Sequence, residues 1–180
     1  MKGMCMATTA GYVGLFGESG AALADTDWLA HANRHPTPNL KAFNAEFIAG
    51  RREDRYLQIA YTPPPTAFNV AALSGGSLAE MLDQAATHCG TFVTGHPCPT
   101  MMMTVTFLRP GLGDRFVAEG RVHKVNSASV VLGAELFDER GRPIATASVV
   151  SHLLTDMDRL VAPQPAQGAP LPLRHADRIG

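Results

Sequence analysis

The clearest pattern in the chain is an apolar stripe at helical spacing between residues 75 and 90. Its positions recur at i, i+3, i+4, i+7, i+8 and i+11, and they are Leu78, Met81, Leu82, Ala85, Ala86 and Cys89. Such a stripe predicts one long amphipathic helix whose apolar face packs on the concave side of a sheet. Ser74 or Ser77 can cap its start, and Ser77-x-x-Glu80 fits a capping box.

From residue 100 onward the pattern changes to closely spaced strands. They are expected at 100–108, 115–125, 128–138 and 143–154. The breaks between them are too short for parallel crossovers, so neighbouring strands should be antiparallel. An earlier strand is expected at 55–62, and a short helix at 25–35 ends before two prolines. This order predicts an α+β fold with one sheet and one main helix.

The two ends of the chain differ from its middle. Glycines recur through the first 24 residues, which we interpret as a flexible arm, and residues 158–180 form a proline-rich segment expected to be a mobile tail. Residues 25–157 are expected to fold as a single domain, since the whole chain has only 180 residues.

Composition excludes several classes of protein. The net charge is −1, without the basic excess typical of nucleic-acid-binding proteins. No apolar run approaches the length of a membrane span, so no membrane partner is expected. The three cysteines form no CxxC pair or convincing disulfide set, which favours a reducing, cytoplasmic location.

Two features of the 75–90 helix suggest chemistry. Gly75 and Gly76 lie in its first turn, where free N–H groups and the helix dipole can hold an oxyanion at close range. Asp83 and Thr87 lie one turn apart on the flank opposite the apolar face, together with Glu80. By itself that flank is typical of a solvated surface. A carboxylate together with an oxyanion-binding helix start, however, is what acyl transfer requires.

Three motifs carry a resemblance to a known family. They are "SGGSLAEMLD" at 74–83, "TMMMTVTFLRP" at 100–110 and "LFDERGRPIATAS" at 136–148. In this order and spacing they resemble the hotdog-fold acyl-CoA thioesterase superfamily, particularly its PaaI-like (phenylacetyl-CoA thioesterase) branch. The resemblance implies a curved antiparallel sheet wrapped around one long central helix. It also implies hydrolysis of acyl-CoA to free acid and CoA without a metal or cofactor, because CoA is part of the substrate.

The resemblance also implies roles for single residues. Asp83 matches the catalytic carboxylate, acting as general base or nucleophile, and Gly75 the residue whose N–H polarises the thioester carbonyl. Thr87 and Thr100 match positions whose hydroxyls orient the water or the carboxylate. The carboxylate and the glycine N–H of one site come from different protomers in this family. A homodimer, or a homotetramer of two such dimers, is therefore expected.

The chain departs from the family pattern at two positions. Ser74 replaces the signature histidine, and its hydroxyl can cap the helix. Ser74 and Gly76 are candidate contacts for the substrate. The family also places an Asn or Gln helper for the carbonyl six positions before the histidine. Phe68 stands there in this chain, and Asn69 lies one residue closer to Ser74, so a one-residue loop deletion would let Asn69 serve. Arg109 is a candidate contact for CoA phosphates. His88 and the His96–Cys98 segment could suggest a metal site or a Cys–His pair, but convergent partners are missing.

Two alternatives to a thioesterase stay open. A non-catalytic acyl-CoA-binding hotdog module is favoured by the missing histidine, whereas the presence of Asp83 and Gly75 favours the enzyme. Another hotdog activity, hydratase or dehydratase, is the rival enzyme, although the His/Asp signatures of those branches are not evident in the sequence.

Overall fold

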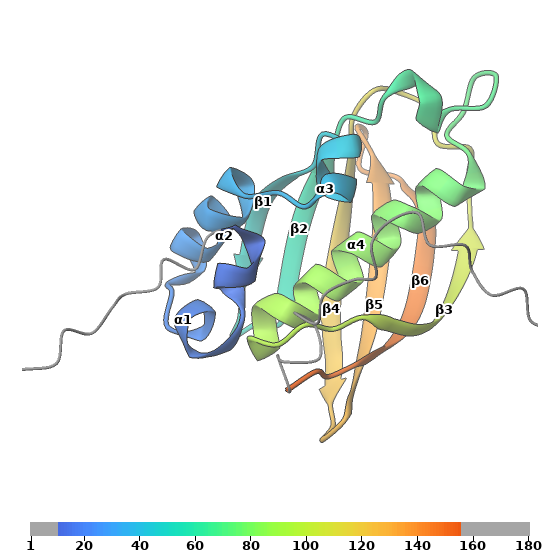
Figure 1. The fold of residues 1–180 in the computed structure, drawn as a ribbon. Coiled ribbons are helices and arrows are strands. Elements are labelled where there is room, and N and C mark those ends of the chain that lie inside the picture. Colours follow the sequence, from blue (N-terminus) through green and yellow to red (C-terminus); the bar gives the residue numbers. More distant parts are fainter. Residues whose placement is uncertain (1–10, 156–180) are drawn as a thin grey trace, which may run out of the picture.

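The computed structural model describes residues 11–155, which form one six-stranded antiparallel sheet with a long helix across its concave face (Figure 1). The helical elements are η1 (Tyr12–Leu15), α1 (Gly17–Ala21), α2 (Asp25–Arg34), α3 (Pro38–Ala42), η2 (Pro65–Ala67) and α4 (Gly75–Thr94). The strands are β1 (Glu46–Arg51), β2 (Tyr56–Tyr61), β3 (Thr100–Phe107), β4 (Phe116–Val125), β5 (Ser129–Asp138) and β6 (Pro143–His152). Their order in the sheet is β1-β2-β4-β5-β6-β3, so β1 and β3 are the two edges.

The α4 helix supplies the centre of the core. All six residues of the predicted apolar stripe are buried against the sheet. The helix contacts β2, β4, β5 and β6, and the sheet curves around it (Figure 1). The expected hotdog arrangement of a curved sheet around one long helix is therefore confirmed.

The helix is longer than the sequence pattern predicts. It runs to Thr94 because the buried side chains continue through Thr91 and Phe92. It ends at Gly95, whose φ of 71° is left-handed and favours glycine as the C-terminal cap.

β2 and β3–β6 correspond to the five expected strands, and one strand was missed. The hairpins β4–β5 and β5–β6 are antiparallel, as expected. The expectation that the strands at 100–108 and 115–125 are neighbours is wrong, because β3 lies at the far edge of the sheet and pairs with β6, while β4 pairs with β2. β1 was not predicted. Its pairing with β2 shifts register between Phe47 and Ala49, and this bulge disrupts the alternation by which a strand is recognised.

The N-terminal segment differs from expectation. Residues 11–24 form η1 and α1 rather than a flexible arm, because Leu15 of this segment is fully buried in the core. Arg52 fastens the segment to the sheet. Its guanidinium donates to Asp25 Oδ1 and the Leu23 carbonyl, both at 2.7 Å, to the Gly20 carbonyl at 3.1 Å and to the Phe92 carbonyl at 2.9 Å. Residues 1–10 and the predicted tail at 158–180 lie outside the described residues.

None of the helices between residues 11 and 155 is both long enough and apolar enough to cross a bilayer.

The α4 helix approaches the sheet closely at Gly120 of β4. A Cβ atom at this position would overlap the Ala85 carbonyl of α4 and lie 2.8 Å from Cys89 Cβ. A glycine here therefore sets how closely the helix can lie on the sheet.

We predict that Gly120→Ala lowers the free energy of unfolding by about 1–3 kcal/mol, the usual cost of overpacking a dense core. Chemical denaturation followed by circular dichroism measures this change. Gly76→Ala is the control, since the nearest atom to its added Cβ is Ser74 Oγ at 3.9 Å. Equal stability of Gly120→Ala and wild type would show that α4 does not depend on this contact.

Candidate functional site

Asp83 lies half-buried on α4, where the first residue of β3 reaches it. Thr100 Oγ1 donates a hydrogen bond of 2.5 Å to Asp83 Oδ1. Partial burial raises the pKa of the Asp83 carboxyl above its usual value, the Thr100 hydrogen bond lowers it, and the charge of Glu80 raises it further. The net effect is a raised pKa, which suits a carboxylate that must accept a proton.

Asp83 opens onto a cavity of about 440 Å³ beside α4. The cavity is lined by η1, α3, one face of α4 and the segment that leads into β3. Its residues are Tyr12, Phe16, Thr37, Asn39, Asp83, Thr87, His88, Thr91, Pro97, Cys98, Pro99 and Thr100. The structure thus brings together three of the predicted site residues, Asp83, Thr87 and Thr100.

The hydroxyl of Thr87 has a different partner from the one expected. It donates to the main-chain carbonyl of Asp83 at 2.7 Å, one helical turn back, rather than to the Asp83 carboxylate. Threonine commonly bonds in this way inside a helix. Thr87 therefore contributes to the cavity wall, while Thr100 holds the carboxylate.

The start of α4 is a second part of the site. Ser74 is the N-cap, and its Oγ accepts from the Ser77 N–H at 3.1 Å. Ser77 in turn donates to the Ala67 carbonyl at 2.8 Å, which fastens the preceding loop. The capping pair is thus Ser74 with Ser77, and the predicted box of Ser77 with Glu80 is wrong because Ser77 already lies inside the first turn.

The first-turn glycines are close to the edge strand β3. The Phe107 ring lies beside Gly75, where an added Cβ would be 3.4 Å from the ring. First-turn N–H groups have no acceptor within their helix, so those of Gly75 and Gly76 are suited to bind a ligand oxygen.

Gly75 and Asp83 cannot meet one small group within a single chain. They are eight residues apart on one straight helix, which corresponds to about 12 Å along its axis. A thioester carbonyl contacted by both would need Gly75 from one copy of the chain and Asp83 from another.

Two further predicted residues lie away from the Asp83 cavity. Asn69 is in the loop before α4, on a separate hollow that also includes Phe68 and Asp114. Arg109 follows β3, is exposed, and donates to the Pro143 carbonyl at 2.6 Å. Within one protomer neither residue reaches Asp83.

Sequence reasoning missed Tyr12 and Phe16, which line the cavity, and it considered His88 only as a metal ligand. Tyr12 Oη lies 2.9 Å from His88 Nδ1. Among residues 11–155, no group of three His, Cys, Asp or Glu side chains could hold a metal ion. The available signal was the apolar "YVGLF" at 12–16, which is atypical of a flexible arm.

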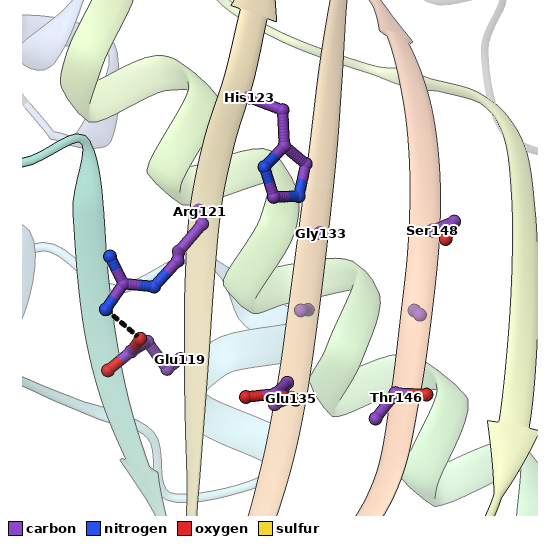
Figure 2. A pocket seen from close by; sticks show the side chains of 9 residues that line it. Glu119, Arg121, His123, Gly133, Glu135, Thr146 and Ser148 are labelled. Carbon is purple, nitrogen blue, oxygen red and sulfur yellow. Dashed lines mark ion pairs between the residues drawn. The ribbon is translucent and has the colours of Figure 1, made fainter.

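A second hollow lies on the face of the sheet that is turned away from α4 (Figure 2). It is centred on Gly133, with Arg121 and His123 on β4 and Glu135 on β5. Two of its charged side chains form an ion pair, with the Glu119 carboxylate 2.6 Å from the Arg121 guanidinium. Glu119 also accepts a hydrogen bond from the Gln58 side-chain amide at 2.8 Å. The hollow is on the opposite side of the sheet from Asp83 and Gly75, so it does not belong to the same site.

The comparisons with known proteins agree with this geometry. The sequence model of the thioesterase superfamily matches residues 71–145. No curated protein matches the chain significantly. This match agrees with the resemblance carried by the three motifs and covers most of the segment in which they lie.

Several solved structures share the fold. A putative thioesterase from Ralstonia eutropha JMP134, described as related to phenylacetic acid degradation, has a TM-score of 0.64 at 22% identity, covering 72% of this chain and 98% of its own. The E. coli PaaI protein of the phenylacetic acid degradation operon also has a TM-score of 0.64, at 21% identity, with 72% and 94% covered. A hypothetical thioesterase from Streptococcus pneumoniae, solved with coenzyme A, has a TM-score of 0.58 at 18% identity, with 64% and 90% covered.

The Thr100–Asp83 hydrogen bond generates a prediction. Thr100→Val keeps the shape of the side chain but removes the donor, so the pKa of Asp83 should rise above the wild-type value. Carbon-13 NMR of the carboxyl group during a pH titration measures this shift. Thr104→Val, in the same strand, should leave the titration unchanged. An identical Asp83 pKa in wild type and Thr100→Val would mean that the hydroxyl does not stabilise the carboxylate in solution.

Proposed function

Because the chain has the hotdog fold and its residues 71–145 match the model of the thioesterase superfamily, we propose that it belongs to this superfamily and hydrolyses acyl-CoA thioesters to a free acid and coenzyme A. The observation that carries the proposal is Asp83, a carboxylate with a raised pKa that opens onto a cavity and is held by Thr100. The likeness to the E. coli PaaI protein supports the PaaI-like branch. The coenzyme A bound to the S. pneumoniae neighbour supports a CoA thioester as ligand.

The chemistry needs only groups of this chain. Asp83 takes a proton from water as general base, and the resulting hydroxide forms a bond to the thioester carbonyl carbon. Alternatively, the carboxylate attacks the carbonyl directly and water then hydrolyses the acyl–enzyme anhydride. In both routes the partner's Gly75 N–H stabilises the oxyanion and the C–S bond breaks. In the first route the proton taken up by Asp83 passes to the sulfur, and in the second CoA leaves as a thiolate that takes up the proton released when water hydrolyses the anhydride. The reaction requires no metal or separate cofactor, because CoA enters as part of the substrate.

The remaining site residues take supporting roles in this proposal. Thr100 orients the Asp83 carboxylate, and Thr87 lines the cavity one turn away. Ser74 caps the helix so that the Gly75 and Gly76 N–H groups face the ligand. Arg109 and Asn69 do not line the Asp83 cavity of their own chain, so their proposed role is to contact the CoA part of the substrate or a site completed by a second copy.

The separation of Gly75 and Asp83 supports a homodimer if both act on one thioester, and the sheet offers a surface for it. β3 pairs with β6 on one side only, so its other edge presents unpaired N–H and C=O groups. Met101, Met102, Phe107 and Leu108 are exposed along and just after this strand. We propose that two copies join through β3, with a tetramer of two such dimers as the larger assembly. We also propose a reducing, cytoplasmic location, in which the buried Cys89 and Cys98 would stay as thiols.

The alternative function is a non-catalytic acyl-CoA-binding module. Ser74 favours it, because a hydroxyl engaged with Ser77 supplies no imidazole to the reaction. Turnover of a panel of acyl-CoA thioesters, measured as release of free thiol, separates the two functions.

We predict that Asp83→Asn folds and binds acyl-CoA but hydrolyses it at least about a hundredfold more slowly, the usual scale for losing a general base. In the wild type, kcat/KM should rise with pH through the raised pKa of Asp83, because only the ionised carboxylate accepts a proton. Thiol release and calorimetric binding measure the two properties.

The matched control is Glu80→Gln, one turn earlier on the same flank of α4. Glu80 accepts hydrogen bonds from Gln84 and Asn39 but does not line the cavity. Its replacement should change hydrolysis far less. If Asp83→Asn retained wild-type turnover, the hydrolase mechanism would be lost and the binding module would take its place.

We also predict that the double variant Met101→Lys with Met102→Lys dissociates the dimer and loses hydrolysis, because charges along β3 oppose pairing of its edge with another strand. Light scattering reports the mass, and circular dichroism checks that the fold persists. Ile48→Lys, on the opposite edge strand β1, is the control and should stay dimeric. A wild-type protein that is fully active as a monomer at micromolar concentration would contradict the shared site.

A further inference from the structure

One wall of the Asp83 cavity comes from η1, an element outside the sheet and α4. Tyr12 and Phe16 belong to this wall. Asp83, Thr87 and Thr91 follow one face of α4 over two turns, about 12 Å along the axis. The cavity therefore extends along the helix away from the reacting carboxylate and passes the N-terminal segment.

The composition of the lining indicates which part of an acyl-CoA fits there. None of its twelve residues is lysine or arginine. The phosphates of CoA call for such cations. Aromatic rings, prolines and threonine methyl groups make up most of the surface, and it suits an acyl chain.

Tyr12 is held in a fixed position. Its hydroxyl meets His88 Nδ1 at 2.9 Å, and the two rings lie 5.2 Å apart between centroids. Its ring also makes edge contacts with Phe16 at 5.9 Å and Trp28 at 6.4 Å. The Gly17 N–H donates to the Gly95 carbonyl at 2.7 Å, which ties the segment to the end of α4. A side chain fixed at this many points acts as a rigid wall.

Both members of the Tyr12–His88 pair are uncharged at neutral pH. Burial lowers the pKa of His88 to about 4, so the imidazole is neutral. Burial, and to a smaller extent Cys98, raises the pKa of Tyr12. A carboxylate at the far end of an acyl chain would find no cation here to replace its hydration, and burying it would be costly.

Resting on the proposed thioesterase function, we propose that Tyr12, positioned by His88, is the specificity-determining residue that restricts the Asp83 cavity to compact, uncharged acyl groups. A smaller side chain at position 12 lengthens the cavity, and a larger one shortens it. The effect falls on the choice of acyl group, because Tyr12 does not touch the groups that activate water.

The experiment compares Tyr12→Ala and Tyr12→Trp with wild type on straight-chain acyl-CoA thioesters from butanoyl to decanoyl. The ratio of kcat/KM for decanoyl-CoA to that for butanoyl-CoA should rise at least about tenfold in Tyr12→Ala, the scale of an added or removed methylene contact. The ratio should fall in Tyr12→Trp. Val13→Ala, in the same turn but absent from the cavity wall, is the matched control and should keep the wild-type ratio.

Opposite shifts in the two variants separate a specificity role from loss of structure, because structural damage would lower all rates in both. If Tyr12→Ala fails to fold, the fall of the ratio in Tyr12→Trp still tests the proposal. An unchanged ratio in the folded variants would overturn it.

A second arm of the experiment compares succinyl-CoA with butanoyl-CoA, whose acyl groups have equal numbers of carbon atoms. Wild type should prefer butanoyl-CoA at least about tenfold, and equal rates would overturn the restriction to uncharged groups.

Calorimetric affinities for the same thioesters distinguish failure of this proposal from failure of the thioesterase function. If wild type turns over no thioester while the affinities shift with residue 12 as described, the thioesterase function fails and the role of Tyr12 stands. If wild type turns over thioesters while neither rates nor affinities change with residue 12, the thioesterase function stands and the role of Tyr12 fails.

Discussion

The close packing of α4 against the concave face of the sheet is the constraint on which the rest of the structure depends. Gly120 allows the Ala85 carbonyl to approach β4. The buried stripe from Leu78 to Cys89 fixes the rotational setting of the helix about its own axis. That setting determines which residues remain outside the core. Asp83 and Thr87 then lie at the border of the sheet, and Gly75 lies beside the edge strand.

The same packing explains why the candidate site combines burial with access. Asp83 is taken partly out of water by α4 and its neighbours, which raises the pKa of its carboxyl. Thr100 limits the rise by donating one hydrogen bond. Because the two groups come from α4 and from the strand that follows it, a short segment of chain is enough to set the properties of the carboxylate. The oxyanion donors, at the other end of the helix, face the free edge of β3.

Much of this arrangement could be predicted from the sequence because it depends on local pattern. The stripe of α4 and the short turns between β4, β5 and β6 were sufficient for an α+β fold with one sheet and one main helix, whereas the hotdog arrangement and the roles of Gly75 and Asp83 came from the resemblance of three motifs. The place of β3 at the far edge was not predicted. Other features could not be predicted, because they depend on contacts between distant residues. The bulge in β1 interrupts its alternation of buried and exposed residues. Residues 11–24 are held against the sheet partly by Arg52, whose guanidinium donates to the Leu23 carbonyl 29 positions earlier. The meeting of Tyr12 with His88 joins residues 76 positions apart.

The fastening of the N-terminal segment by Arg52 separates two properties that evolution can then change independently. The sheet, α4 and Thr100 hold the proposed water-activating carboxylate, whereas the segment that ends at Asp25 forms part of the cavity wall and depends on one guanidinium and its acceptors. Neither Asp83 nor Thr100 belongs to this segment, so a change within it leaves their hydrogen bond in place. On the proposed function, new substrate ranges could therefore arise on this scaffold through changes in a leading peptide that keep its buried Leu15.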